Sequence, residues 1–250
     1  MKAINNKKSV DHFDKLAVQH NTNYASVLDA SDNENATHSN TIHDYFSKKF
    51  VKNYTKINKN SVVLDFGCGV GRLTQYFQPK VKKIYGTDAS TKMMEVARVK
   101  NIDKKISYID SLDEIPEKSL DIVFTNWVLA HIEDESIVQT FIQLKNKLND
   151  NARICIFEQV PANEDKKMQN EVYYRRSIKE YEIIFEKAGY KLTKSKLIYR
   201  QPSYARAIWN KLPSSFSFLL PLLYFVEKKT LFRKAEFAIY YTAFMEFKVK

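Results

Sequence analysis

Several features of secreted, membrane-spanning and metal-binding proteins are absent from this sequence. Its two cysteines, Cys68 in a glycine-rich turn and Cys155 in an apolar run, do not have the setting of a disulfide, and a reducing cytoplasm is expected. The first ten residues, MKAINNKKSV, lack the apolar run of a secretion signal. The apolar run 216–226 is interrupted by Pro221 and is too short to span a bilayer. No His and Cys cluster has metal-ligand spacing, so we expect no metal.

The composition is that of one globular domain with a basic surface. Hydrophobic residues make up 44% of the 250 residues and aromatic residues 13%, which is enough for a full core. The chain has no internal repeat and no Pro- or Gly-rich linker, which favours a single domain over residues 1–250. The net charge of +11 favours anionic partners, although any basic soluble protein has the same property. There is no aromatic RNA-binding signature, so no nucleic acid is expected.

The stretch VVLDFGCGVGRL, residues 62–73, joins an apolar strand to a glycine turn. Gly67, Gly69 and Gly71 occupy alternate positions, and a helix is expected to open near Arg72. Glycine allows positive φ and close approach of a ligand to the backbone, and a helix start offers unpaired N–H groups. This turn is therefore a candidate ligand site.

Asp88 ends the next expected strand, 21 positions after Gly67. An acid at this position is placed to accept hydrogen bonds from the ribose hydroxyls of a nucleoside. The alternative is that Asp88 caps the helix that begins around Ser90. Both interpretations remain open at this stage.

Strands and helices alternate along most of the chain. After strand 62–66, strands are expected within 82–90, 104–110, 120–130, 152–160, 191–199 and 238–250, the last returning to the sheet edge. Residues 31–40 are expected to be a loop, a helix to start at Thr41, and another to follow a capping box of Ser177 and Glu180 and to stop at Gly189. This order predicts an α/β fold whose mostly parallel, seven-stranded sheet has helices on both faces.

Four successive segments carry a family resemblance. LDFGCGVGRLT, GTDAS, ISYIDSLDEIP and SLDIVFTNWVLAHIEDE, within about residues 40–200, resemble the cofactor motifs of class I S-adenosylmethionine-dependent methyltransferases. In the dinucleotide fingerprint two residues separate the last glycines, whereas here one residue separates Gly69 from Gly71, which argues against a nicotinamide enzyme. The resemblance implies a Rossmann-like fold and S-adenosylmethionine as cofactor.

The resemblance also implies which residues contact the cofactor. The glycine turn would face the methionine part, Asp88 the ribose, Asp110 with its neighbours the adenine, and Asn126 with Trp127 the sulfonium. Arg72 either belongs to this set or only supports the helix start. The complete set of expected cofactor residues is Asp65, Gly67, Cys68, Gly69, Arg72, Asp88, Ala89, Met93, Asp110, Ser111, Leu112, Asn126 and Trp127.

Two residues are candidates for the base that methyl transfer to an alcohol would use. His131 follows Asn126 by five residues and has a side chain of suitable pKa, and the alternative is that it is structural. Glu158, expected at the end of the fifth strand, is the second candidate, with a solvated loop carboxylate as the alternative. Tyr173, Tyr174, Arg175 and Arg176 are expected to bind substrate, because paired guanidinium groups and rings suit a phosphate or a nucleotide-linked sugar. The alternative is a solvated helix start.

Together these features predict O-methylation of a small anionic acceptor, such as a phosphate-bearing or nucleotide-linked sugar of a surface glycan. Residues 1–40 are expected to form an N-terminal arm or lid, 41–200 the cofactor-binding core, 201–234 an inserted substrate lid and 235–250 the final strand. If the 216–226 run lies at a membrane surface, the acceptor would be a lipid or a quinone. A binding protein without catalysis, with RNA or a protein as partner, is the alternative of another class.

Overall fold

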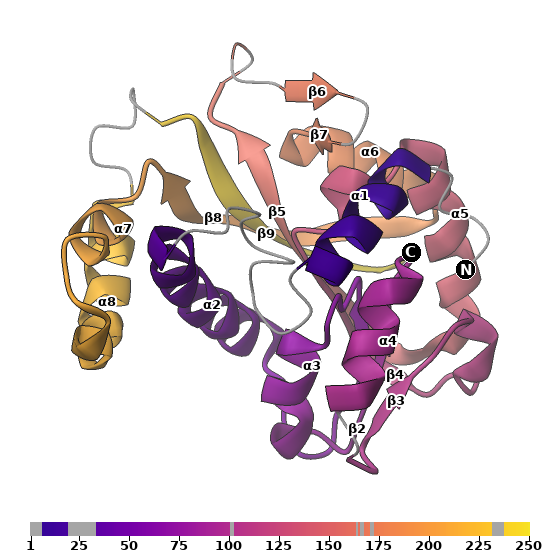
Figure 1. The fold of residues 1–250 in the computed structure, drawn as a ribbon. Helices are drawn as coiled ribbons and strands as arrows, with labels where there is room; N and C mark the ends of the chain where they lie inside the picture. The colour runs from indigo at the N-terminus through magenta and orange to yellow at the C-terminus, as the bar shows by residue number, and fades with distance from the viewer. Residues whose placement is uncertain are drawn as a thin grey trace.

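A seven-stranded sheet forms the centre of the molecule (Figure 1). The computed structural model describes residues 7–19, 34–100, 103–163, 165, 168–170, 173–231 and 238–250. Parts of the expected arm, and residues 232–237 at the junction of the expected lid and last strand, lie outside this set. No helix within the described ranges is long and apolar enough to cross a membrane.

The elements follow one another in the alternating order that the sequence predicts. The sheet strands are β1 (Val62–Phe66), β2 (Lys83–Thr87), β3 (Ile106–Tyr108), β4 (Leu120–Asn126), β5 (Leu148–Pro161), β8 (Tyr190–Gln201) and β9 (Tyr240–Val249). The helices are α1 (Lys7–Gln19), α2 (Glu34–Thr55), α3 (Arg72–Phe77), α4 (Thr91–Lys100), α5 (Asp134–Leu144), α6 (Ile178–Lys187), α7 (Tyr204–Trp209) and α8 (Leu220–Thr230). A small hairpin pairs β6 (Met168–Asn170) with β7 (Tyr173–Arg175).

The strand order β3-β2-β1-β4-β5-β9-β8 confirms the predicted fold class. Strands β3 to β5 pair in parallel, and β9 is antiparallel to both of its neighbours. The expectation that the last strand returns to the sheet edge is wrong, because β9 lies between β5 and β8 and β8 forms the edge. Residues 241–247 of β9 are mostly apolar and are buried on both faces, as an interior strand requires.

Two apolar cores cover the two faces of the sheet, which confirms the prediction of helices on both sides. On one face, Phe141 of α5 and Phe185 of α6 pack beneath Leu64. On the other, Phe46 of α2 and Phe77 of α3 pack with Val63. Adjacent residues of β1 thus point to opposite cores, and the carboxyl ends of the parallel strands remain available for a site.

The loop expected at 31–40 is wrong from residue 34 onward, because α2 begins at Glu34. Tertiary contacts stabilise this polar start. The His38 ring stacks on Trp209 of α7 at 4.5 Å, and Trp209 Nε1 donates to the His38 carbonyl at 2.8 Å. Trp209 is fully buried. A residue 171 positions away thus extends the helix, which local pattern cannot reveal.

Candidate active site

The glycine turn joins β1 to α3 and is built around a buried acid. Asp65 is 2% exposed, and Thr74 Oγ1 donates to its Oδ2 at 2.6 Å. Burial raises the pKa of Asp65 to about 7, although the Thr74 hydroxyl opposes this shift. At Gly67, φ is 79°, and an added Cβ would come within 2.4 Å of the Val128 side chain. The turn at this position therefore admits no side chain.

Asp88 joins the end of β2 to the glycine turn. Its Oδ2 accepts the backbone N–H of Gly69, and its Oδ1 accepts that of Ser90, both at 2.9 Å. The helix α4 is capped by Ser90 instead, whose Oγ accepts from Met93 N. The alternative role of Asp88 as that helix cap is therefore wrong. Burial raises the pKa of Asp88, and its two backbone hydrogen bonds oppose the shift.

A cavity of about 310 Å³ lies at the carboxyl ends of β1, β2, β4 and β5. This is where ligands bind in open parallel sheets. Most of the residues expected to hold the cofactor form its walls. They are Asp65, Gly67, Cys68, Gly69, Arg72, Asp88, Ala89, Met93, Asn126 and Trp127.

Helix α1 forms another wall of this cavity. It contributes Ser9, Val10, His12, Phe13 and Leu16. The Phe13 ring meets His131 edge to face at 5.0 Å. The next residue of α1, Asp14, accepts hydrogen bonds from Ser90 Oγ and from the backbone N–H of Lys92 at the start of α4. A carboxylate at a helix N-terminus is favourable, so α1 is fastened to the ribose side of the site.

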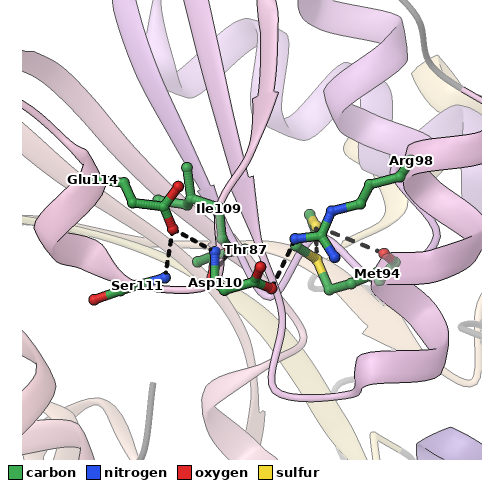
Figure 2. Close-up of polar contacts among 9 residues, drawn as sticks. Thr87, Met94, Arg98, Ile109, Asp110, Ser111 and Glu114 are labelled. Carbon is green, nitrogen blue, oxygen red and sulfur yellow. Dashed lines mark hydrogen bonds and ion pairs between the residues drawn. The ribbon is translucent and has the colours of Figure 1, made fainter.

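The three residues expected at the adenine are not among those that line the cavity. Figure 2 shows two of them, Asp110 and Ser111, with their contacts to Arg98 and Glu114. The Asp110 carboxylate is paired with Arg98 at 2.7 Å and its side chain is 78% exposed. Glu114 Oε1 accepts the backbone N–H groups of Asp110 and Ser111, at 2.8 and 3.0 Å. Leu112 is buried and opens a short 3-10 helix. Their predicted contact with adenine stays a prediction.

Several residues of the cavity walls have a buried polar atom with no hydrogen-bond partner within the described part of the chain. These atoms include Asn126 Oδ1, Trp127 Nε1 and Glu158 Oε2. Asn126 ends β4, and Trp127 has φ of 59°, a left-handed conformation that is costly for a bulky residue. Buried polar atoms without partners are rare and indicate that a ligand completes their hydrogen bonds. Strained backbone of this kind is concentrated at functional sites.

Glu158 lies within β5 and is fully buried, so the alternative of a solvated loop carboxylate is wrong. Its Oε1 accepts the backbone N–H groups of Val128 and Leu129, both at 2.7 Å. Burial raises its pKa to about 7 despite these two hydrogen bonds and the nearby Arg176. Its other oxygen is buried without a partner among the described residues, and Glu158 is one of the residues that line the cavity. A carboxyl group of this pKa can exchange a proton near neutral pH.

The four residues expected to bind substrate are divided by the fold. The Tyr173 ring forms part of the cavity wall, meets His131 at 5.4 Å, and its hydroxyl donates to Gln159 Oε1 at 2.6 Å. The Arg175 guanidinium lies 5.7 Å from the Tyr173 ring and 4.7 Å from the Tyr240 ring. The other three, Tyr174, Arg175 and Arg176, lie outside the cavity walls and line a second pocket.

Arg176 stabilises the turn that carries His131. Its guanidinium is buried, pairs with Asp134 at 2.6 Å, and donates to the carbonyls of Leu129 at 2.8 Å and Ile132 at 2.6 Å. These carbonyls belong to and follow the short 3-10 helix Leu129–His131. Arg176 thus holds in place the turn that carries His131.

Sequence reasoning missed the site residues of α1 and Gln159. The spacing of Val10, Phe13 and Leu16 is that of an apolar helix face and could have indicated a docked helix. Nothing local indicates what it docks against. The inserted segment, in contrast, forms none of the cavity wall over its described residues 201–231.

The residues present fit S-adenosylmethionine. The turn at Gly67 has backbone where a side chain would collide, and Asp88, expected at the ribose, accepts the Gly69 N–H. Asn126 and Trp127, expected at the sulfonium, line the cavity and each has a buried polar atom without a partner among the described residues. A cavity with these features at the switch between β1 and β4 is that of a class I S-adenosylmethionine-dependent methyltransferase.

Comparison with known proteins gives the family. Residues 13–209 match the family model of AdoMet-dependent proline di-methyltransferases, and the chain belongs to this family. The Drosophila melanogaster alpha N-terminal protein methyltransferase 1 is 24% identical over 158 residues, covering 56% of this chain and 54% of that protein. The chain spans about half the length of the curated relatives it matches.

Two solved structures share the fold. A SAM-dependent methyltransferase of Leishmania major superposes with a TM-score of 0.63 at 15% identity, covering 97% of this chain and 82% of that one. A phosphoethanolamine N-methyltransferase of Haemonchus contortus, solved with S-adenosyl-L-methionine, superposes with a TM-score of 0.54 at 18% identity, covering 82% and 52%. The family is one of S-adenosylmethionine-dependent methyltransferases, and the cavity residues of this chain fit that cofactor.

Proposed function

We propose that the protein methylates an amine nitrogen. The observation that carries this proposal is the buried Glu158 Oε2, an acceptor in the cavity wall with no donor among the described residues. An amine brings N–H donors to such an oxygen, whereas a phosphate or carboxylate brings more acceptors. The match to proline di-methyltransferases, which act on nitrogen, supports the same choice.

The charge around the cavity also favours an amine. Its walls include three carboxyl groups, those of the buried Asp65 and Glu158 and of the half-buried Asp88. The arginine in the wall, Arg72, is paired with Asp44 of α2 at 2.6 Å. A site with this balance attracts a cationic ammonium group more than an anion.

The chemistry requires a neutral amine held in line with the methyl group. When bound, S-adenosylmethionine supplies an electrophilic methyl group on a sulfonium. Asn126 and Trp127 would orient the cofactor, while the rings of Phe13 and Tyr173 on either side of His131 exclude water and position the acceptor.

His131 and Glu158 are the groups that would take the amine proton. Both belong to the cavity wall, and Arg176 fixes the turn of His131 through two carbonyls. The nitrogen lone pair forms the new bond to carbon, the carbon–sulfur bond breaks with its electrons remaining on sulfur, and the N–H proton passes to one of these two bases.

The relatives suggest which amine to test first. The Drosophila protein carries the name alpha N-terminal protein methyltransferase, so a peptide with a free N-terminal amine is our first acceptor. One observation favours O-methylation of an anionic acceptor as the second candidate. Arg175 does not line the cavity, but its guanidinium lies 5.7 Å from the ring of Tyr173, which does, and a guanidinium group can bind a phosphate.

The test is a panel of acceptors incubated with S-adenosylmethionine and measured by mass. We expect methylation of peptides that start with Pro or Ala, loss of the product when the N-terminus is acetylated, and no product with phosphorylated or nucleotide-linked sugars. Methylation of the sugars alone would overturn the nitrogen proposal in favour of the second candidate.

Variants at the two candidate bases complete the test. Both His131→Asn and Glu158→Gln should lower kcat by roughly 10²-fold, while calorimetry finds cofactor affinity nearly unchanged. Glu117→Gln, at an exposed position outside the cavity walls, is the matched control and should keep kcat. Normal turnover in both base variants would rule out the assigned proton transfer.

A further inference from the structure

An apolar surface on the inserted segment lies outside the site described above. Four side chains between residues 216 and 225 face solvent and are named the α8 face: Phe216, 38% exposed, Phe218, 70%, Leu222, 56%, and Phe225, 56%. The rings of Phe216 and Phe218 stack at 5.6 Å. Figure 1 shows α7 and α8 at one end of the molecule, beside α2.

The α8 face is held by a well-packed hairpin, so its exposure is not the result of poor folding. Leu220 and Leu223 of α8 are buried in the core shared with α2. Glu227, 2% exposed, accepts Ser203 Oγ at 2.7 Å and Ala205 N at 3.0 Å, which fastens the end of α8 to the start of α7. The chain thus holds these exposed side chains in place.

The charges beside the α8 face are basic. Between residues 204 and 231 the single acidic residue is the buried Glu227. Lys228 and Lys229 follow Phe225 and are exposed, with ammonium groups 5.9 Å from the Tyr224 ring and 5.5 Å from the Phe225 ring. On α2, Lys49 lies 5.2 Å from the ring of Tyr45, which itself meets Tyr224.

This arrangement matches a lipid surface better than a second copy of the chain. If a fully exposed Phe or Leu presents about 200 Å², the four side chains expose on the order of 400 Å², within the range of the largest patches on single proteins, which are often functional. A standard protein interface buries about 800 Å² on each partner, about twice that area. Lysine stems that follow apolar surface while their ammonium groups reach water also suit the boundary between acyl chains and headgroups.

We propose that the α8 face binds the surface of an anionic lipid bilayer. Its aromatic and aliphatic side chains enter the boundary between headgroups and acyl chains, and the flanking lysines contact anionic headgroups. The described residues of the hairpin form no part of the cavity wall, so this binding is independent of the methyl acceptor.

The experiment is cosedimentation of the full chain with vesicles. We expect binding to phosphatidylcholine vesicles that contain 30% phosphatidylglycerol, weaker binding to phosphatidylcholine alone, and release by salt. The double variant L222E/F225E should lower the bound fraction at least about tenfold, because it replaces apolar contact by carboxylates that would be desolvated. The variant K228Q/K229Q should weaken binding to anionic vesicles and leave the weak binding to neutral vesicles unchanged.

A matched control distinguishes vesicle binding through the α8 face from nonspecific hydrophobic adsorption. Ile142→Glu changes an aliphatic residue of α5 that is 42% exposed and should leave vesicle binding intact. The variant F218W should show a blue shift of tryptophan emission on anionic vesicles. Absence of wild-type binding to anionic vesicles, equal binding by L222E/F225E, or a stable dimer in sedimentation that L222E/F225E abolishes would each overturn the proposal.

Discussion

Helix α1 and the α7–α8 hairpin both pack outside the central sheet. Their amino-acid compositions do not indicate which of them lies over the cavity. Helix α1 is short and largely polar, whereas the α7–α8 hairpin contains the apolar run 216–226. Yet α1 covers the cavity through Phe13 and its neighbours, and the hairpin packs beside α2 and turns an apolar face to solvent. The sequence predicted an arm or lid for residues 1–40 and a substrate lid for the hairpin, but the described residues of the hairpin do not line the cavity.

This contrast indicates that the hydrogen-bonding groups at the edge of the cavity determine which segment packs over it. At the cavity, the start of α4 presents Ser90 Oγ and backbone N–H groups, and Asp14 of α1 accepts them. The hairpin carries no exposed acid that could make this contact, and Trp209 finds its partner at the start of α2. Hydrophobicity alone does not indicate which surface a segment covers.

The largest expected effect tests the hairpin as a structural element. Trp209→Ala should lower the free energy of unfolding by about 3–5 kcal/mol, because a fully buried ring is removed and a cavity remains. Urea denaturation measures this loss. The neighbouring Ile208→Ala, at a position 44% exposed, should change stability by less than about 0.5 kcal/mol. A Trp209→Ala protein of normal stability but poor cofactor binding would instead connect the hairpin with the site.

The second prediction concerns the pH dependence of stability and tests whether Glu158, in the cavity that α1 helps to close, is buried. Burial raises the pKa of Glu158 to about 7, above its value in the unfolded chain. Its contribution to stability is therefore present at low pH and is lost as pH rises through about 7. Glu158→Gln should remove roughly 2–3 kcal/mol of this decline, and Asp65 should continue to contribute in the same window.

Urea titrations at pH 5 and pH 8 measure that decline. Glu117→Gln, at an exposed position, is the control and should leave the difference between the two pH values unchanged. If Glu158→Gln also leaves the difference unchanged, solvent reaches Glu158 and α1 does not close the cavity.

The smallest effect compares one phenylalanine from each added segment. Phe13→Ala should weaken S-adenosylmethionine binding about tenfold, a loss of about 1.4 kcal/mol, because it removes a ring from the cavity wall. Phe218→Ala, on the α8 face, should leave the affinity unchanged. Calorimetry measures both. The reverse order of effects would mean that the hairpin, and not α1, covers the bound cofactor.

Local patterns predicted the elements that local chemistry determines. The glycine turn, the alternation of strands and helices, and the capping box of Ser177 and Glu180 are all confirmed. The capping box shows how local chemistry determines an element. Its hydrogen bonds join residues only three positions apart and depend on the residue types at those positions. Most of the expected cofactor residues also lie together, since the carboxyl ends of parallel strands meet at one edge.

What the sequence did not reveal depends on contacts between distant residues. The start of α2 relies on Trp209, and the burial of Glu158 relies on the backbone N–H groups of Val128 and Leu129, 30 and 29 positions away. The place of β9 between β5 and β8 depends on pairing with both. Neither periodicity nor local motif carries this information.

The position of β9 has a consequence for how the molecule is made. Strand β8 reaches the sheet through β9, which follows it in the chain after the whole α7–α8 hairpin. During synthesis, β1 to β5 can pair as they emerge, but β8 has no place to bind until the residues of β9 are available. The α7–α8 hairpin is therefore a loop that must close before the sheet is complete, a late and long-range step that slows folding.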